Sequence, residues 1–264
     1  MIDLHCHILP GIDDGPETIE DSVALARSAV AAGIGTTLAT PHVNRTYPND
    51  SATIARLTAE LSARLEHERI ALEIRPGAEI AITRLTDLDP AELARLGLAG
   101  GPWLLIEPPF SPVATNLDAL LMDLQHRGHR VLLAHPERCA AFHRDPEMLG
   151  SLVRAGILTS ITAGSLVGRF GEQVRRFALR LAREGLVHNV ASDAHDHLQR
   201  PPGMAQELEQ VGLGPLAEWL TQLVPEAIMT GEQTIPPQPS VRLSSIESDR
   251  RSWWRRRARL KQAL

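Results

Sequence analysis

The sequence predicts an α/β protein whose single domain is a closed or nearly closed, distorted barrel of seven parallel β/α units. Short apolar stretches alternate with longer helical patterns, which is the order that parallel β/α folds require. His, Asp and Glu residues recur where these apolar stretches end. A length of 264 residues is sufficient for one barrel domain of seven β/α units.

Seven apolar stretches have the length and composition of strands. The expected strands lie near Ile2–His5, Thr36–Ala39, Ala71–Arg75, Trp103–Ile106, Arg130–Leu133, Ile157–Ile161 and Leu186–Ala191. No internal repeat is visible that would indicate a solenoid.

The first helix shows the usual start and stop signals. Thr18 can cap its N-terminus, and Gly33 follows as a stop. One apolar face is expected from Ile19, Val23, Ala26 and Val30. Further helices are expected at Ile54–Glu68, Asn116–Arg127, Pro146–Ala155 and Glu172–Glu184.

Composition excludes several classes of protein. The apolar share is 43%, and no run of about 18 apolar residues could span a bilayer. The N-terminus has no basic region followed by an apolar stretch, so we expect a cytoplasmic protein. Cys6 and Cys139 form neither a disulfide framework nor a Cys-x-x-Cys motif, and we expect two reduced thiols.

The charge is unevenly distributed along the chain. Residues 242–264 hold eight basic and two acidic residues, a net charge of +6, so the total of −5 leaves −11 for the rest. An acidic body argues against a nucleic-acid surface as the main function. A Pro-Pro-Gln-Pro-Ser stretch after Ile235 predicts a domain over 1–235 and a linker with a basic tail over 236–264. Arginines and tryptophans suit this tail to contact a membrane or a protein, although a solvated, frayed terminus explains it equally well.

The first strand ends in His5-Cys6-His7. Side chains at positions i and i+2 of a strand point to the same side, so His5 and His7 can bind one metal while Cys6 faces the opposite side. Alone, this motif is a weak indication of a metal site.

The same kind of residue recurs after the other strands. The motifs are Thr40-Pro41-His42, Gly77-Ala78-Glu79, Glu107, Ala134-His135-Pro136-Glu137-Arg138 and Ser192-Asp193-Ala194-His195. In a parallel barrel the strand ends lie on one face, where loops assemble an active site. With Asp14 from the first loop, the candidate set is His5, His7, Asp14, His42, Glu79, Glu107, His135, Asp193 and His195.

These five histidines and four carboxylates exceed what one ion needs, so two or three divalent ions are implied. Ligands of this kind without thiolates suit Mn²⁺, Fe or Zn²⁺. Bound ions lower the pKa of water and clamp phosphate oxygens. Arg138 and Arg200 follow the His135 and His195 motifs closely, and their guanidinium groups could bind a substrate phosphate, the alternative for each being a surface salt bridge. The other histidines, at positions 67, 126, 129, 143, 188 and 197, are interpreted as surface or core residues.

The first motif, from His5 to Gly15, closely resembles the opening of bacterial PHP (polymerase and histidinol phosphatase) tyrosine phosphatases of the CpsB/CapC-like capsule type. The resemblance continues through the motifs at His42, Glu79, His135 and Asp193 and covers roughly residues 1–235. The loop Val43–Tyr47 and the basic tail depart from the family's pattern.

The resemblance implies a (β/α)7 PHP-type barrel with three divalent metals, most often Mn²⁺, with Fe, Zn²⁺ or Co²⁺ as alternatives. It implies the nine ligands named above, with Arg138 and Arg200 as phosphate-binding residues. The implied substrate is phosphotyrosine on an autophosphorylating bacterial tyrosine kinase that controls capsule or exopolysaccharide synthesis. The expected reaction is in-line attack of a metal-bound hydroxide on phosphorus, with Asp14, His42 or a metal-bound water as proton donor to the leaving phenolate.

Three alternatives have different support in the sequence. A cysteine phosphatase loop needs five residues between Cys and Arg, whereas Cys139 and Arg144 have four between them, so this mechanism is disfavoured. A small phosphomonoester such as histidinol phosphate would suit the same site in a deeper pocket. A non-catalytic scaffold that docks a kinase through its tail would not need so many ligands on one face.

Overall fold

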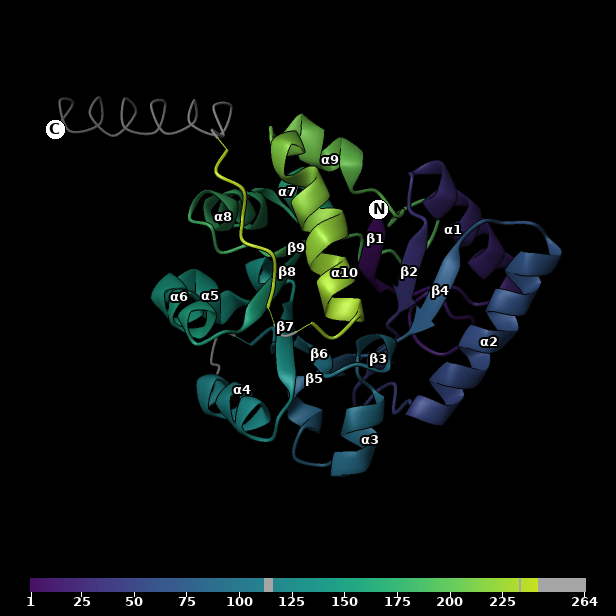
Figure 1. The fold of residues 1–264 in the computed structure, drawn as a ribbon, viewed down its shortest axis with the longest axis horizontal. Coiled ribbons are helices and arrows are strands. Elements are labelled where there is room, and N and C mark those ends of the chain that lie inside the picture. Colours follow the sequence, from purple (N-terminus) through teal and green to yellow (C-terminus); the bar gives the residue numbers. More distant parts are fainter. Residues whose placement is uncertain (112–115, 233, 242–264) are drawn as a thin grey trace, which may run out of the picture.

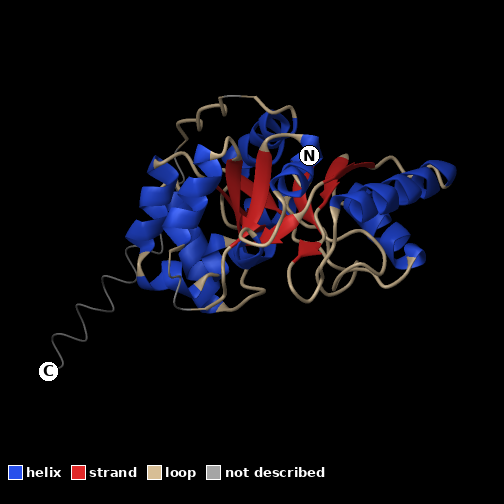
Figure 2. Cartoon of the chain, turned by 90° about the horizontal axis from the view of Figure 1, so that it is seen from below, coloured by secondary structure: helices blue, strands red, loops and turns tan. Residues whose placement is uncertain are grey.

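The computed structural model describes residues 1–111, 116–232 and 234–241. It is a mixed α/β fold in which every pair of neighbouring strands is parallel. The strands lie in the middle of the molecule, with helices on either side (Figure 1, Figure 2). The basic tail that the sequence predicts lies beyond Val241 and thus outside the described residues.

The strands form two sheets. The three-stranded sheet consists of β1 (Ile2–Cys6), β2 (Thr36–Ala39) and β4 (Glu73–Pro76). The six-stranded sheet consists of β3 (His42–Val43), β5 (Glu79–Ala81), β6 (Trp103–Glu107), β7 (Arg130–Ala134), β8 (Leu158–Thr162) and β9 (Asn189–Ala191). Each of the seven predicted strands overlaps an observed one, and β3 and β5 were not predicted.

A single closed barrel is not confirmed, because two short interruptions divide the strands between the sheets. Thr40 and Pro41 separate β2 from β3, and Gly77 and Ala78 separate β4 from β5. Pro41 has no N–H group to donate to a neighbouring strand, which favours a break there. One isolated parallel bridge, between Cys6 and Ala194, joins the end of β1 to the segment after β9.

The helices cover the outside of the strands. Their bounds are α1 (Ile19–Ala31), α2 (Ser51–His67), α3 (Pro90–Arg95), α4 (Leu117–His126), α5 (Ala140–Arg144), α6 (Pro146–Arg154), α7 (Ala163–Leu166), α8 (Glu172–Arg183), α9 (Ala205–Gln210) and α10 (Val224–Met229). Helices α1 and α2 lie beside β2 and β4, whereas α4, α5, α6 and α8 lie on the side of β7 and β8 (Figure 1). Five of these helices overlap the predicted ones. No described helix is both long and apolar enough to cross a membrane.

Helix α1 begins as its sequence predicts. The Thr18 hydroxyl accepts a hydrogen bond from the Asp21 amide, and the Asp21 carboxylate accepts one from the Thr18 amide. Gly33 follows the helix with a φ of +82°, a conformation that glycine adopts without strain. The predicted apolar face is wrong at Val30, which is 37% exposed, because the buried stripe passes through Leu25 and Ala29 instead.

The chain remains on the domain surface after the predicted boundary at residue 235. The Trp219 indole Nε1 donates to the carbonyl oxygen of Pro236 at 2.9 Å. Ile235 and Val241 are partly buried against the hydrophobic core. The beginning of the predicted linker, from Pro236 to Val241, therefore contacts the domain. The division into 1–235 and 236–264 stays a prediction.

His188 precedes β9 and lies away from the strand ends that carry the candidate ligands. Its Nδ1 atom accepts a hydrogen bond from the amide of Thr159 at 3.2 Å, which requires the unprotonated nitrogen. Burial lowers the pKa of His188 to about 4. The neutral imidazole is therefore part of the folded structure at neutral pH.

This burial predicts a loss of stability in acid. The folded-state pKa of His188 lies below its value in the unfolded chain, so the contribution is complete above about pH 6.5 and is lost as the pH falls toward 4. The full contribution to the free energy of unfolding is about 3 kcal/mol. Replacing His188 with Asn, whose side-chain oxygen can accept the same bond, should flatten the decrease in unfolding free energy between pH 7 and pH 5 in urea titrations. The exposed His126→Asn variant is the control, and an unchanged pH dependence in His188→Asn would contradict this role.

Candidate metal centre

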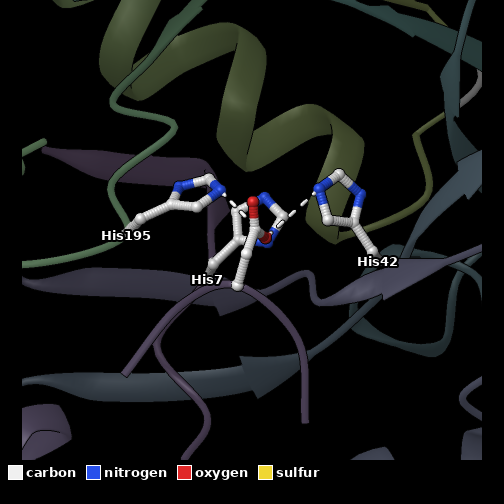
Figure 3. Close-up of side chains that lie close together, drawn as sticks. His7, His42 and His195 are labelled. Atoms are coloured by element: carbon white, nitrogen blue, oxygen red, sulfur yellow. Dashed lines mark ion pairs between the residues drawn. The ribbon is translucent and has the colours of Figure 1, made fainter. Parts of the chain in front are cut away.

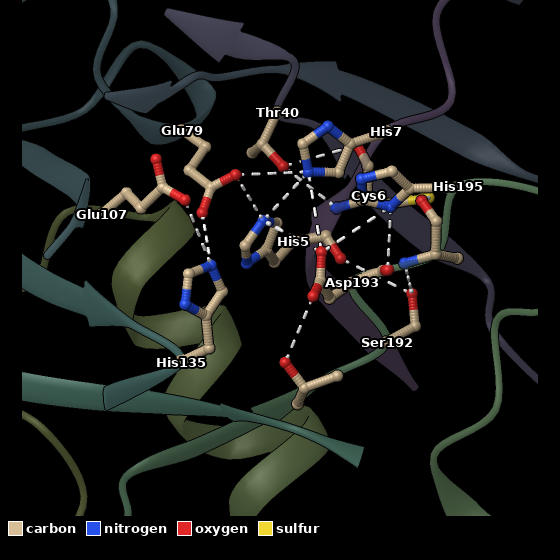
Figure 4. A network of polar contacts seen from close by, with 12 residues as sticks. His5, Cys6, His7, Thr40, Glu79, Glu107, His135, Ser192, Asp193 and His195 are labelled. Carbon is tan, nitrogen blue, oxygen red and sulfur yellow. Dashed lines mark hydrogen bonds and ion pairs between the residues drawn. The ribbon is translucent and has the colours of Figure 1, made fainter. Parts of the chain in front are cut away.

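All nine candidate ligands lie in one cluster where the strands end. Figure 4 shows His5, His7, Glu79, Glu107, His135, Asp193 and His195 of this cluster. The cluster contains four overlapping groups whose potential ligand atoms lie within 4.8 Å of one another. The groups are His7, Asp14, His42 and His195; His5, His7 and Asp193; His5, Glu79 and His135; and His42, Glu79 and Glu107. The expected proximity is therefore observed, whereas binding of metal by these residues stays a prediction.

Strand register explains why His42, Glu79 and Glu107 converge. In the pairing of β3 with β5, His42 lies opposite Glu79. In the pairing of β5 with β6, Ala81 lies opposite Glu107. Residues 79 and 81 point to the same side of a strand, so Glu79 and Glu107 share a face.

Glu79 is the centre of the cluster. Its side chain is 1% exposed, and its Oε2 atom lies 3.2 Å from His5 Nε2 and 3.3 Å from His7 Nε2. The same oxygen lies 3.0 Å from His42 Nδ1. The other oxygen, Oε1, lies 2.7 Å from His135 Nε2. One buried carboxylate thus contacts four imidazoles.

Asp14 joins the histidines on the solvent side. Its Oδ1 atom lies 3.4 Å from His42 Nε2 and 3.3 Å from His195 Nε2. The rings of His7, His42 and His195 are turned toward this position (Figure 3). Asp14 is 45% exposed, so this end of the cluster is open to a substrate.

Asp193 connects the histidines to the two arginines. Its Oδ2 atom accepts from Arg138 Nη1 at 2.9 Å and lies 2.8 Å from Arg200 Nη2. Its Oδ1 atom lies 3.6 Å from His5 Nε2 and 3.7 Å from His7 Nε2. Both arginines are partly exposed, so their remaining donors are available to an anion.

Two candidate ligands have strained backbone conformations. His135 has a φ of +28°, and Asp193 has a φ of +52°. Residues other than glycine rarely adopt positive φ, and such strain is concentrated at functional sites. The strain at these two strand ends therefore supports a functional role for this face.

Burial and charge shift the pKa values within the cluster. Burial alone would raise the pKa of Glu79, but His5 and His135 outweigh it and hold it well below the usual range. Burial, together with repulsion from Glu79, raises the pKa of Glu107 to about 7. Burial lowers the pKa of His195 to about 4, so this imidazole is neutral at pH 7 and able to coordinate a metal.

Buried polar atoms without hydrogen-bond partners also indicate that these residues fit divalent ions. Four buried atoms have no hydrogen-bond partner among the described residues: His42 Nδ1, Glu79 Oε2, His135 Nδ1 and His195 Nε2. Unpaired buried polar atoms are rare in folded proteins and require an explanation such as an ion. His5 Nε2 and His7 Nε2 lie 3.2 Å apart, a separation that two ligands of one ion can adopt when each lies about 2.1 Å from it.

Asp13 is a functional candidate that the sequence reasoning missed. Its Oδ2 atom lies 2.6 Å from His7 Nδ1 and accepts from the His42 amide at 3.0 Å. Burial would lower the pKa of His7, but Asp13 outweighs it and raises that pKa well above the usual value. A Cβ atom at Gly15 would clash with the backbone oxygen of His7, so the glycine that follows Asp13 and Asp14 is the feature of the sequence that could have indicated a tight contact here.

Glu137 was also missed, although it lies within the His135-Pro136-Glu137-Arg138 motif. Its buried carboxylate accepts from the Thr162 amide at 2.9 Å and from the Ser165 hydroxyl at 2.7 Å. It therefore ties the segment that carries His135 and Arg138 to the end of β8.

The remaining predicted assignments agree with the geometry. Cys6 is buried in the hydrophobic core, and burial raises its pKa well above the usual value. Cys139 is also buried with a raised pKa, so neither thiol is an activated nucleophile. Among the described residues, the histidines at 67, 126, 129, 143, 188 and 197 belong to none of the four groups.

The contact between Asp13 and His7 predicts weaker metal binding in an Asp13→Asn variant. The carboxylate fixes the ring orientation of His7 and increases its basicity, and losing such a partner typically reduces metal affinity 10- to 100-fold. Isothermal titration with Mn²⁺ should show this loss, whereas Asp21→Asn, at the exposed start of α1, should bind Mn²⁺ like the wild type. Equal affinity of the Asp13→Asn and wild-type proteins would refute a positioning role.

Comparison with known proteins agrees with the resemblance in the sequence. Residues 1–213 match the family "Capsular polysaccharide synthesis, CpsB/CapC". The tyrosine-protein phosphatase YwqE of Bacillus subtilis is 44% identical over 197 residues, which cover 74% of this chain and 78% of that protein. The putative tyrosine-protein phosphatase CapC of Staphylococcus aureus is 34% identical over 204 residues, which cover 76% and 79%.

The fold agrees as well. A solved chain from the work on YwqE of Bacillus subtilis and CpsB of Streptococcus pneumoniae, described as unique metal-dependent tyrosine phosphatases, superposes with a TM-score of 0.79 and 40% identity. The match covers 92% of this chain and 100% of that chain. Sequence and structure together show that this chain belongs to the CpsB/CapC family.

Proposed function

We propose that this protein is a metal-dependent tyrosine-protein phosphatase that hydrolyses phosphotyrosine in proteins. The observation that carries the proposal is the cluster of nine His, Asp and Glu side chains, which has two arginines bound to its Asp193. The named activity of the relatives in the same family supports it.

His5, His7, Asp14, His42, Glu79, Glu107, His135, Asp193 and His195 would hold two or three divalent ions, with Mn²⁺ as our first choice and Fe, Zn²⁺ or Co²⁺ as alternatives. Such ions would supply a water of lowered pKa and neutralise charge on the phosphate. Glu79 is suited to bridge ions because both of its oxygens face imidazoles.

Arg138 and Arg200 would orient the phosphate and stabilise charge on its equatorial oxygens. Both side chains already converge on Asp193 Oδ2, and the buried Arg200 Nε atom has no hydrogen-bond partner in the described part of the chain. Asp14 and His42 lie at the open end of the cluster. The contact with His195 holds the pKa of Asp14 well below its usual range, so Asp14 is ionised and has no proton to give. His42, or a water bound to the ions, would therefore deliver the proton to the leaving phenolate. A phenolate with a pKa of about 10 needs little assistance to leave.

We infer that the two sheets act as one distorted (β/α)7 barrel. Joining β2 to β3 and β4 to β5 across their two-residue gaps gives seven bent strands in the order of the chain. The bridge from Cys6 to Ala194 would close the ring. This arrangement would explain why ligands from the first and last strands meet.

The physiological substrate that we propose is an autophosphorylating tyrosine kinase of capsule or exopolysaccharide synthesis. The name of the matched family, capsular polysaccharide synthesis, supports this choice. The basic segment 236–264 would provide a contact with that kinase or with the inner face of the membrane, where anionic groups attract arginine. Truncation after Val241, which keeps the contact of Trp219 with Pro236, should preserve turnover of a small aryl phosphate if the tail serves only for docking.

The activity is tested by hydrolysis of a phosphotyrosine peptide and of histidinol phosphate, each with added Mn²⁺ or with a chelator. We expect metal-dependent turnover that prefers the peptide, and a loss of at least 100-fold in kcat for His135→Ala, because this imidazole contacts Glu79 at the centre. The exposed His126→Ala variant is the control. A preference for histidinol phosphate would show that the substrate is a small phosphomonoester. Activity that depends neither on metal nor on His135 would refute the proposal.

The arginine role is tested by Arg138→Lys. Lysine keeps the charge but lacks the planar fork of donors, so it cannot hold Asp193 and a phosphate oxygen in the same geometry. We expect kcat/KM for the phosphotyrosine peptide to fall at least tenfold in steady-state assays. Arg176→Lys on the exposed side of α8 should have no effect, and a fully active Arg138→Lys enzyme would show that the residue is only structural.

A further inference from the structure

Phe110 is a large apolar side chain at the edge of the metal centre. It follows Glu107 by three residues and is 52% exposed. A single exposed apolar residue on a protein surface needs no explanation. The position of the Phe110 ring against two functional groups of the proposed site, however, does need an explanation.

The ring of Phe110 stacks on a candidate ligand and covers an arginine. Its centroid lies 5.8 Å from that of His135, and the two rings are nearly parallel, at 14°. The guanidinium carbon of Arg138 lies 5.2 Å from the centroid of Phe110 and 4.5 Å from that of Phe170. Arg138 is thus held by two rings through cation–π contacts while its Nη1 atom binds Asp193.

The backbone around Phe110 is restricted. Two prolines precede it, and proline fixes φ near −65°, which reduces the number of conformations of the segment. The Cys139 thiol donates to the carbonyl oxygen of Pro109 at 3.3 Å. Because Cys139 follows Arg138 directly, this contact fixes the position of Phe110 relative to the arginine.

We propose that Phe110 binds the aromatic ring of the substrate and thereby selects aryl phosphoesters over alkyl ones. This inference rests on the proposed function, because it requires a phosphate held between the metal centre and Arg138. A phosphate there leaves the ester oxygen and the ring of a phosphotyrosine directed outward, beside the exposed part of Phe110. Two aromatic rings in contact gain about 0.5–1.5 kcal/mol beyond the area that they bury, a gain that a serine side chain cannot provide.

Tyr47 has a similar position on another ligand but is less available. Its ring stacks on His42 with centroids 6.0 Å apart and planes at 9°. Tyr47 is partly buried, and it closes a turn in which the Asn44 amide donates to the Tyr47 carbonyl. Phe110 therefore offers the larger free aromatic surface.

The test compares two phosphonates that cannot be hydrolysed, phenylphosphonate and methylphosphonate, by calorimetric titration of the full chain loaded with Mn²⁺. Phe110→Ala should weaken phenylphosphonate binding about tenfold and change methylphosphonate binding less than twofold, and Phe110→Leu should weaken phenylphosphonate binding by an intermediate factor. Leu223→Ala, which removes an exposed apolar side chain of similar size outside the centre, should bind both ligands like the wild type. Metal content and circular dichroism confirm that each variant is folded and loaded.

Equal losses for both phosphonates in Phe110→Ala would overturn the inference and assign Phe110 to the support of Arg138 alone. Unchanged phenylphosphonate binding would also overturn it, as would a wild-type protein that binds neither ligand. These outcomes are independent of turnover. A wild-type protein that hydrolyses the phosphotyrosine peptide but fails this test would retain the proposed function and lose the role of Phe110.

Discussion

The buried carboxylate of Glu79 is the constraint on which the site depends. Four imidazoles, from His5, His7, His42 and His135, lie within 3.3 Å of its two oxygens. A carboxylate without water is costly unless positive charge or hydrogen bonds compensate it. Imidazoles and carboxylates packed this closely, with several buried atoms that have no hydrogen-bond partner among the described residues, are best compensated by divalent ions. We therefore regard metal binding as the condition under which this arrangement is stable.

The fold produces this arrangement by bringing the first and last strands together. His5 and His7 come from the end of β1, and Asp193 follows β9 nearly two hundred residues later in the chain. The Asp193 amide donates to the His5 carbonyl, and the His7 amide donates to the Ala194 carbonyl, each at 2.9 Å. Backbone hydrogen bonds thus position the ligands before any ion binds.

Much of this could be predicted from the sequence, because a ligand at a strand end is visible as a polar residue after an apolar run. His135 after Arg130–Ala134 is an example. Strands β3 and β5 were missed because each has at most three residues, which is too short for an alternating pattern. Val30 was misplaced because the boundary of a buried helix face depends on which neighbour packs there. The roles that we propose for Asp13 and Phe110 depend on contacts across loops, and spacing in one sequence does not contain that information.

We infer that the cluster around Glu79 is a polynuclear metal centre. Anomalous diffraction from crystals grown with Mn²⁺, recorded on both sides of the manganese absorption edge, tests it without reference to turnover. We predict at least two anomalous peaks within about 2.3 Å of side-chain atoms of the nine residues, one of them beside Glu79. A single peak away from Glu79, or none at the cluster in protein that crystallises with intact strands, would contradict the account.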